Sequence, residues 1–93
     1  MKMRRLRSRI DRADRKLFQA LGERFQAVQE LGVLKRKLGI PVLQKTRWKE
    51  VMQERLALAE SQGLSERFAK KFLKLIHEEA IRVQKAKKRS RKK

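Results

Sequence analysis

The residues of this sequence best suited to binding chemistry are two cations in the stretch LGERFQAVQELGVLKRKLGIPV, positions 21–42. Arg24 stands where a helical repeat of apolar residues calls for a leucine, and Lys35 follows eleven positions later. On a helix this separation is three turns, about 16 Å along the axis, and returns to within about 20° of the same face. Both side chains are therefore expected to lean towards one space.

A guanidinium on the apolar side of a helix needs an anion, because withdrawing it from water costs on the order of several kcal/mol. For Arg24 the sequence leaves two interpretations open. One is a structural ion pair with Glu23, with Glu30 or with an acid of another helix. The other is a site for an anionic ligand.

Three further polar residues are placed to join such a site. Arg47 opens a second expected helix just after a connecting loop, and Gln84 continues the apolar row of a third by one helical step. Arg7 lies about 25 Å from Arg24 along the first helix and is rotated by roughly 100°, so only an antiparallel second chain could bring it to the site. A small dianion would find several fixed donors in such a pocket.

The element that must position Arg24 and Lys35 is a long amphipathic helix. Its apolar seam alternates steps of four and three, the heptad pattern of helices packed against other helices. The seam positions are Leu6, Ile10, Ala13, Leu17, Ala20, Arg24, Ala27, Leu31, Leu34 and Leu38. Gly39 and Pro41 predict that the helix ends near Leu38.

Two shorter helices follow in this prediction, and no segment predicts a strand. One runs from about 46 to 62 and is closed by Gly63, while Ser65 caps the other. The apolar stripe of the last helix consists of Phe68, Phe72, Leu75, Ile76, Ala80 and Val83. Gly22 and Gly32 weaken the first helix, so they indicate close packing there rather than a break.

The first helix is too long for a small domain made of one chain. About 35 helical residues span about 50 Å, whereas a compact chain of 93 residues has a radius of gyration near 12 Å. A seam that is apolar from end to end is most naturally covered by the same helix of a second chain. We therefore expect an all-α fold with three helices per chain, intertwined in a homodimer.

Composition excludes several classes of protein and of chemistry. The chain has no cysteine, no run of 18 apolar residues, no Ser-His-Asp set, no metal-ligand cluster and no glycine-rich phosphate loop. We therefore expect no metal, no cofactor and no membrane span, and we expect His77 to be a surface or packing residue. The basic start MKMRRLRSR continues as IDRADRK instead of an apolar stretch, which favours a cytoplasmic protein over a secreted one.

The net charge of +18 is concentrated at the two ends of the chain. Residues 1–9 hold five Lys and Arg and residues 85–93 hold seven, with no acid in either segment, so the stretch between them carries only +6. We predict a helical domain over residues 1–86 and a basic, disordered tail over 87–93. Such a tail is as well explained by solubility as by contact with RNA, and a nucleic-acid partner is not expected.

The separated polar positions also carry a family resemblance. It consists of LRSRIDRADRKLFQALGERF, a lysine at position 35, GIPV, an arginine at position 47 and IHEEAIRVQ. This combination resembles the all-helical chorismate mutases over nearly the whole span from Leu6 to Gln84. The resemblance implies three helices per chain, intertwined into a dimer with two equivalent sites.

The same resemblance implies the substrate and the residue roles. Chorismate would be rearranged to prephenate, with no proton transfer and no nucleophile. Arg24 and Arg47 would hold substrate carboxylates in one subunit's site, while Arg7 would enter from the other subunit. Lys35 and Gln84 would donate to the ether oxygen of the substrate, and Lys35 would also touch a carboxylate, which makes Lys35, Gln84 and Arg24 the catalytic set.

Trp48 departs from the pattern of many members of the family, which have an acid there to contact the ring hydroxyl of the substrate. An indole cannot accept that hydrogen bond. Gln44, one turn earlier, is the expected replacement, and Glu50 faces elsewhere. The combination VLQKTRW with IHEEAIRVQ resembles a branch often joined to the first enzyme of the shikimate pathway, so association with such an enzyme is a further expectation. Packing on its helix is an equally good interpretation of Trp48.

Two other functions stay open at this point. Isochorismate pyruvate lyases share the expected fold and also lack the acid at the position of Trp48. A non-catalytic helical module, either a sensor of chorismate or prephenate or a nucleic-acid binder, is the other. Products from chorismate and from isochorismate would separate the enzymes, and RNA affinity that survives removal of residues 85–93 would favour the last.

Overall fold

Three α-helices form the fold in the computed structural model, which describes residues 2–86. Helix α1 spans Lys2–Leu38, α2 spans Lys45–Ser61 and α3 spans Glu66–Lys85, with no strand among the described residues. The all-α class and the three helices predicted from the sequence are confirmed. None of these helices contains an apolar stretch long enough to cross a bilayer. The tail predicted over 87–93 lies outside the described residues.

Local sequence signals set the ends of the helices. Gly39 adopts a left-handed φ of 70° after α1, and the amide groups of Gly39 and Ile40 donate to carbonyls of the last turn at 3.3 and 2.9 Å. Gly63, with a φ of 79°, ends α2 in the same way. At the start of α3, Ser65 Oγ accepts a hydrogen bond from the amide of Phe68 at 3.1 Å, as the capping prediction requires.

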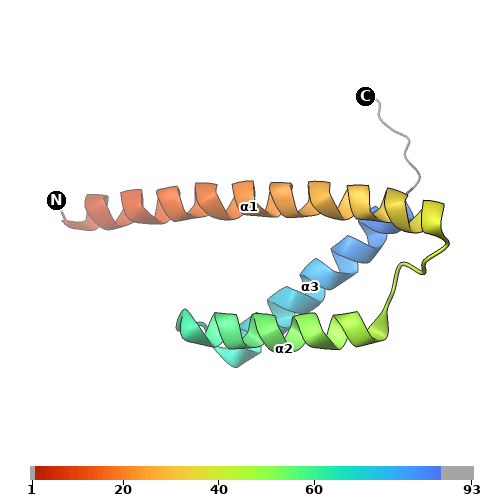
Figure 1. The fold of residues 1–93 in the computed structure, drawn as a ribbon. Helices are drawn as coiled ribbons and strands as arrows, with labels where there is room; N and C mark the ends of the chain where they lie inside the picture. The colour runs from red at the N-terminus through yellow and green to blue at the C-terminus, as the bar shows by residue number, and fades with distance from the viewer. Residues whose placement is uncertain (1, 87–93) are drawn as a thin grey trace, which may run out of the picture.

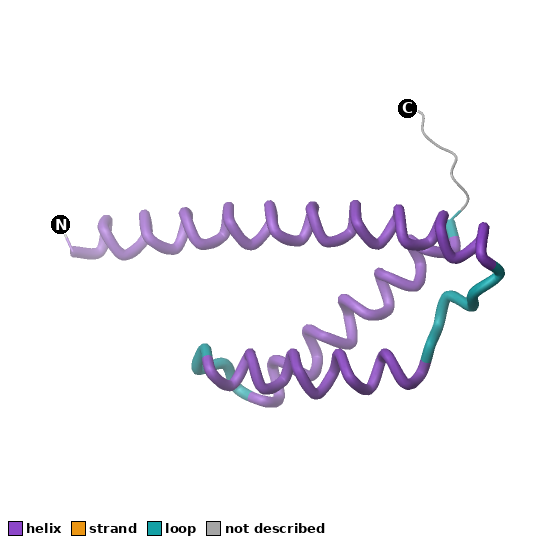
Figure 2. Tube along the Cα trace, viewed as in Figure 1, coloured by secondary structure: helices purple, strands orange, loops and turns teal. Residues whose placement is uncertain are grey.

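Helix α3 packs against both other helices, and α1 runs on past them. Figures 1 and 2 show the N-terminal part of α1 extending beyond α2 and α3 with no other segment beside it. The chain measures 56 × 35 × 15 Å, and its radius of gyration is 16.5 Å. A compact chain of this length would have a radius of gyration of about 12 Å. The molecule is therefore an open arrangement of helices.

The chain by itself buries almost no core. Ala69 and Ala80 are the buried apolar residues of the described part, at 3% and 8% exposure. Residues 2–20 are all exposed, including Leu6, Ile10 and other apolar members of the predicted seam. A long apolar surface on α1 is thus left uncovered by the rest of the chain.

Gly32 is the point of closest approach between α1 and α3. A Cβ at this position would lie 2.9 Å from the Cα of Gln84 and 3.0 Å from its carbonyl oxygen. One turn later, Arg36 Nη1 donates to the same carbonyl at 2.8 Å. The prediction of close packing is confirmed at Gly32 but is wrong at Gly22 within this chain, where a Cβ would meet nothing within 4 Å. Ten positions rotate Gly22 by about 80° from Gly32, and α3 does not cover that face.

Candidate active site

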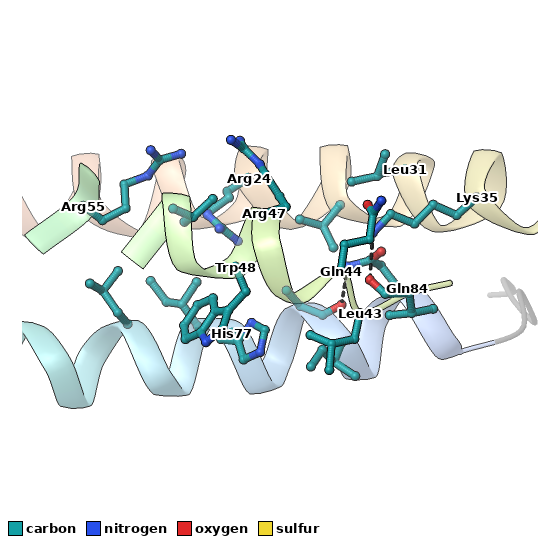
Figure 3. A pocket seen from close by; sticks show the side chains of 17 residues that line it. Arg24, Leu31, Lys35, Leu43, Gln44, Arg47, Trp48, Arg55, His77 and Gln84 are labelled. Carbon is teal, nitrogen blue, oxygen red and sulfur yellow. Dashed lines mark hydrogen bonds between the residues drawn. The ribbon is translucent and has the colours of Figure 1, made fainter. Parts of the chain in front are cut away.

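A cavity of about 190 Å³ lies between the three helices and the loop that follows α1. Figure 3 shows the side chains that line it, and the cavity is partly open to solvent. The polar and aromatic residues around it are Arg24, Lys35, Gln44, Arg47, Trp48, Arg55, His77 and Gln84. Aliphatic side chains such as Val28, Leu31 and Ile81 complete its walls. The space is suited to a small molecule rather than to a polymer.

Five of the six residues predicted to bind a ligand meet at this cavity. They are Arg24, Lys35, Gln44, Arg47 and Gln84. The sixth, Arg7, lies in the exposed N-terminal part of α1 and is not among the lining residues. This is the position that helix geometry predicted for Arg7 within one chain.

Arg24 reaches the cavity without an anionic partner from the described residues. Its Nη1 is buried and has no hydrogen-bond partner there, and neither Glu23 nor Glu30 forms an ion pair with it. Burial lowers the pKa of the Arg24 guanidinium, and the positive charge of Arg55 lowers this pKa further. The structural ion pair considered for Arg24 is therefore not formed within this part of the chain.

Lys35 is buried, with 8% exposure, and is held in place by the loop beyond its own helix. Its Nζ donates to the carbonyl oxygen of Val42 at 2.8 Å. This bond ties the loop to α1 and fixes the ammonium group at the cavity wall. An ammonium group has three N–H donors, so two remain for a ligand.

Gln84 faces the cavity from α3, with 7% exposure. The absence of a side chain at Gly32 lets its backbone approach α1, and Arg36 holds its carbonyl. Its Nε2 makes a long hydrogen bond of 3.3 Å to the carbonyl of Ala80, while its Oε1 is buried without a partner among the described residues. The amide therefore has capacity to bind a ligand.

Gln44 and Arg47 bring polar groups from the start of α2. Gln44 is the N-cap residue, but its side chain makes no capping hydrogen bond, so its amide is available to a ligand. Arg47 is 60% exposed, and its Nη1 lies 3.8 Å from Glu50 Oε1. Such an exposed pair is weak and leaves Arg47 able to turn to a stronger anion. Glu50 does not line the cavity, as its helical position predicted.

Trp48 and His77 form an aromatic wall that the sequence did not predict as a unit. Their ring centroids are 3.6 Å apart with an angle of 20° between the planes, and both residues line the cavity. Burial lowers the pKa of His77 below its ordinary value; Glu78 opposes this shift and Arg24 adds to it. His77 is thus a packing residue, as predicted, and it also reaches the site.

The charges around the cavity are all of one sign. Four cations line it, namely Arg24, Lys35, Arg47 and Arg55, and no Asp or Glu among residues 2–86 does. Sequence reasoning missed Arg55, although its spacing gives a signal: Trp48, Val51 and Arg55 follow at i, i+3 and i+7 on one face of α2. Like charges gathered in this way favour an anionic ligand, and two or more of them favour a dianion.

A family model described as chorismate mutase type II matches residues 6–85 of the chain. The protein belongs to the chorismate mutase type II family. The matched span covers nearly all of the three helices. It includes all six predicted site residues, Arg7 among them. Membership of this family implies an isomerase activity. A comparison with curated proteins gave no match.

Proposed function

We propose that this protein is a chorismate mutase, which rearranges chorismate to prephenate in sites shared between two chains. One observation carries the proposal. Polar residues from all three helices and from the loop after α1 surround a single cavity that holds four cations and no acid from the described residues. Such a set of guanidinium and ammonium groups is complementary to a small dicarboxylate such as chorismate.

The proposed reaction asks little covalent chemistry of the protein. A C–O bond breaks while a C–C bond forms within one molecule, so no proton has to be moved and no nucleophile is needed. The protein contributes by holding the flexible substrate in its reactive shape. In this proposal Arg24 and Arg47 bind the carboxylates, and the aliphatic and aromatic walls exclude water.

Lys35 and Gln84 are proposed to stabilise the ether oxygen as negative charge develops on it. They lie on α1 and α3, at walls that the Gly32 contact holds together. Lys35 already has a fixed ammonium group with spare donors. Gln84 Nε2 has two N–H donors, and its long bond to the Ala80 carbonyl uses one of them, so the second would donate into the cavity. Donors fixed before the reaction need no reorganisation in the transition state.

The second chain belongs to the same proposal. The exposed seam of α1 includes Leu6 at 44%, Ile10 at 57% and Leu17 at 44% exposure, and the chain has too small a core to stand alone. An antiparallel α1 of a second copy would cover this seam. It would also carry Arg7 to the open side of the cavity, completing the anion site.

The presence of Trp48 in the cavity wall favours a second candidate reaction. Its indole is stacked on His77 in the cavity wall, so this wall offers no carboxylate to accept a hydrogen bond from a ring hydroxyl. Isochorismate pyruvate lyase activity in the same cavity is therefore the alternative. Gln44 is our proposed contact for the ring hydroxyl of chorismate.

Supplying chorismate and isochorismate separately to the purified protein and identifying the products tests the proposal. We expect prephenate from chorismate and no pyruvate from isochorismate. Pyruvate released from isochorismate would assign the lyase reaction instead. Binding of chorismate without any product would indicate a sensing module. A Lys35→Ala variant is the control for contaminating enzyme, since its activity should be lost.

A further inference from the structure

We propose that Arg55 is a further substrate-binding residue, which shares with Arg24 one carboxylate of the bound diacid. The inference rests on the proposed function, because it assumes that the ligand carries two carboxylates. Arg55 lies on α2, its side chain is 40% exposed, and it lines the same cavity as Arg24. Arg55 is not among the residues to which the sequence analysis assigned a role.

Arg24 and Arg55 are two like charges that line the same cavity. Arg55 is the charged residue whose field acts on the Arg24 guanidinium, and no Asp or Glu of residues 2–86 lines the cavity around them. Arg24 Nη1 is at the same time buried with no hydrogen-bond partner among residues 2–86. Two neighbouring guanidinium groups with unused donors are stabilised when a carboxylate binds between them.

Without a ligand, Arg55 has a weak partner outside the cavity. Its Nη1 lies 3.0 Å from Glu54 Oε1, but Glu54 is the adjacent residue and its side chain is 64% exposed. Glu54 does not line the cavity. An ion pair in solvent contributes little, and a guanidinium has five N–H donors, so this contact leaves Arg55 free to bind a carboxylate.

The hydrogen-bond donors are spread along the cavity. Figure 3 shows Arg55 at one end of the cavity, Arg24 and Arg47 near its middle, and Lys35 and Gln84 towards the other end. The two carboxylates of a diacid would then be recognised at separate places. The arginine pair is assigned to the carboxylate farther from Lys35 and Gln84, which are the proposed donors to the reacting oxygen.

The test measures the dissociation constants of prephenate and of its two monomethyl esters by calorimetry. The proteins are the wild type, Arg24→Gln, Arg55→Gln, the double variant and Arg67→Gln as a control for an exposed arginine of α3 outside the cavity. We expect Arg55→Gln to weaken prephenate binding about tenfold, the order of one charge-assisted contact. One of the two esters lacks the carboxylate that the arginine pair binds. The dissociation constant of this ester should be changed by neither Arg24→Gln nor Arg55→Gln. Arg55→Lys should recover part of the affinity.

Because the two arginines hold one carboxylate, the double variant should lose less than the product of the two single losses. Unchanged prephenate affinity in Arg55→Gln would overturn the assignment. Equal weakening of both esters, or a loss confined to thermal stability and subunit association, would also overturn it. Prephenate affinity in a wild-type protein that fails to convert chorismate would contradict the proposed function while still testing Arg55.

Discussion

At the level of single residues, the cavity is lined by four cations and by no Asp or Glu of residues 2–86. Arg24 interrupts an apolar seam, and the structure gives it neither of the nearby glutamates. Lys35 and Gln84 are both more than nine-tenths buried and are held by backbone contacts with neighbouring segments. Preorganised donors of this kind cost stability unless they serve a ligand. We therefore propose that these side chains make the catalytic contribution.

Replacing Lys35 or Gln84 by alanine should lower kcat/KM for chorismate by on the order of 10²-fold or more, because each change removes a proposed donor to the ether oxygen. Steady-state kinetics on each variant, with circular dichroism to confirm the helical fold, measures this. Lys37→Ala, at an exposed position of the same helix, is the matched control and should keep wild-type kinetics. Near-normal rates in the Lys35 and Gln84 variants would refute their roles.

His77 should make stability depend on pH. Burial lowers its pKa in the folded protein below the ordinary value of 6.5, so the unfolded chain takes up a proton first as the pH falls. The contribution of His77 is therefore fully present above about pH 6.5 and decreases below it, until the folded pKa is reached. The fall in melting temperature between pH 7.5 and pH 5.5 should be larger for the wild type than for His77→Gln. Equal falls would show that His77 titrates as in the unfolded chain.

At the level of helices, the α1–α3 contact determines the geometry of the site. Gly32 permits the close approach of α3 to α1, and Arg36 donates a hydrogen bond to the backbone carbonyl of Gln84, whose side chain faces the cavity. Helix α2 then supplies the remaining wall through its contact with α3. The spacing between Lys35 and Gln84 thus depends on a glycine that does not itself line the cavity.

Gly32→Ala should destabilise the protein by about 1–3 kcal/mol and lower activity, because the new Cβ would press on backbone atoms of Gln84 at 2.9 to 3.0 Å. Gly22→Ala is the matched comparison, since nothing lies within 4 Å of its Cβ position in this chain. Alanine favours a helix over glycine by about 1 kcal/mol, so Gly22→Ala should be neutral or stabilising. Chemical denaturation measures both. A destabilised Gly22→Ala would instead place the second chain against Gly22.

The sequence predicted the helices well because their signals are local. Gly39, Gly63 and Ser65 act through turn and capping geometry that needs no distant contact. The placement of Arg24, Lys35 and Gln84 at one cavity followed from helical periodicity, whereas their roles stay predictions. The Trp48–His77 stack and the position of Arg55 at the cavity were harder to predict, because they depend on how α2 and α3 cross. The prediction of close packing at Gly22 is wrong within this chain because Gly22 lies about 80° around α1 from Gly32, away from the contact with α3.

At the level of the whole molecule, one chain leaves a long apolar surface uncovered. It is 56 Å long, its α1 seam is exposed, and its described part buries two apolar residues. Hydrophobic surface of this extent is characteristic of a subunit whose core forms on association. The cavity is incomplete in the same sense, because its open side is where the proposal places Arg7.

Ile10→Asp should disrupt association and, with it, folding, because a charge in the α1 seam would be buried unpaired between the chains. Sedimentation velocity and circular dichroism should show a loss of dimer accompanied by a loss of helix. Asp11→Asn, at the neighbouring position away from the seam, should leave both unchanged. A wild-type protein that is monomeric and fully helical at micromolar concentration would contradict the intertwined dimer.

Mixing an Arg7→Ala variant with an Arg24→Ala variant is the most direct measurement of the central claim. If each cavity needs Arg24 of one chain and Arg7 of the other, a mixed dimer has one intact site and one doubly altered site. Free exchange should then restore about a quarter of wild-type chorismate turnover from two nearly inactive proteins. No recovery, with subunit exchange demonstrated independently, would contradict a site shared between chains.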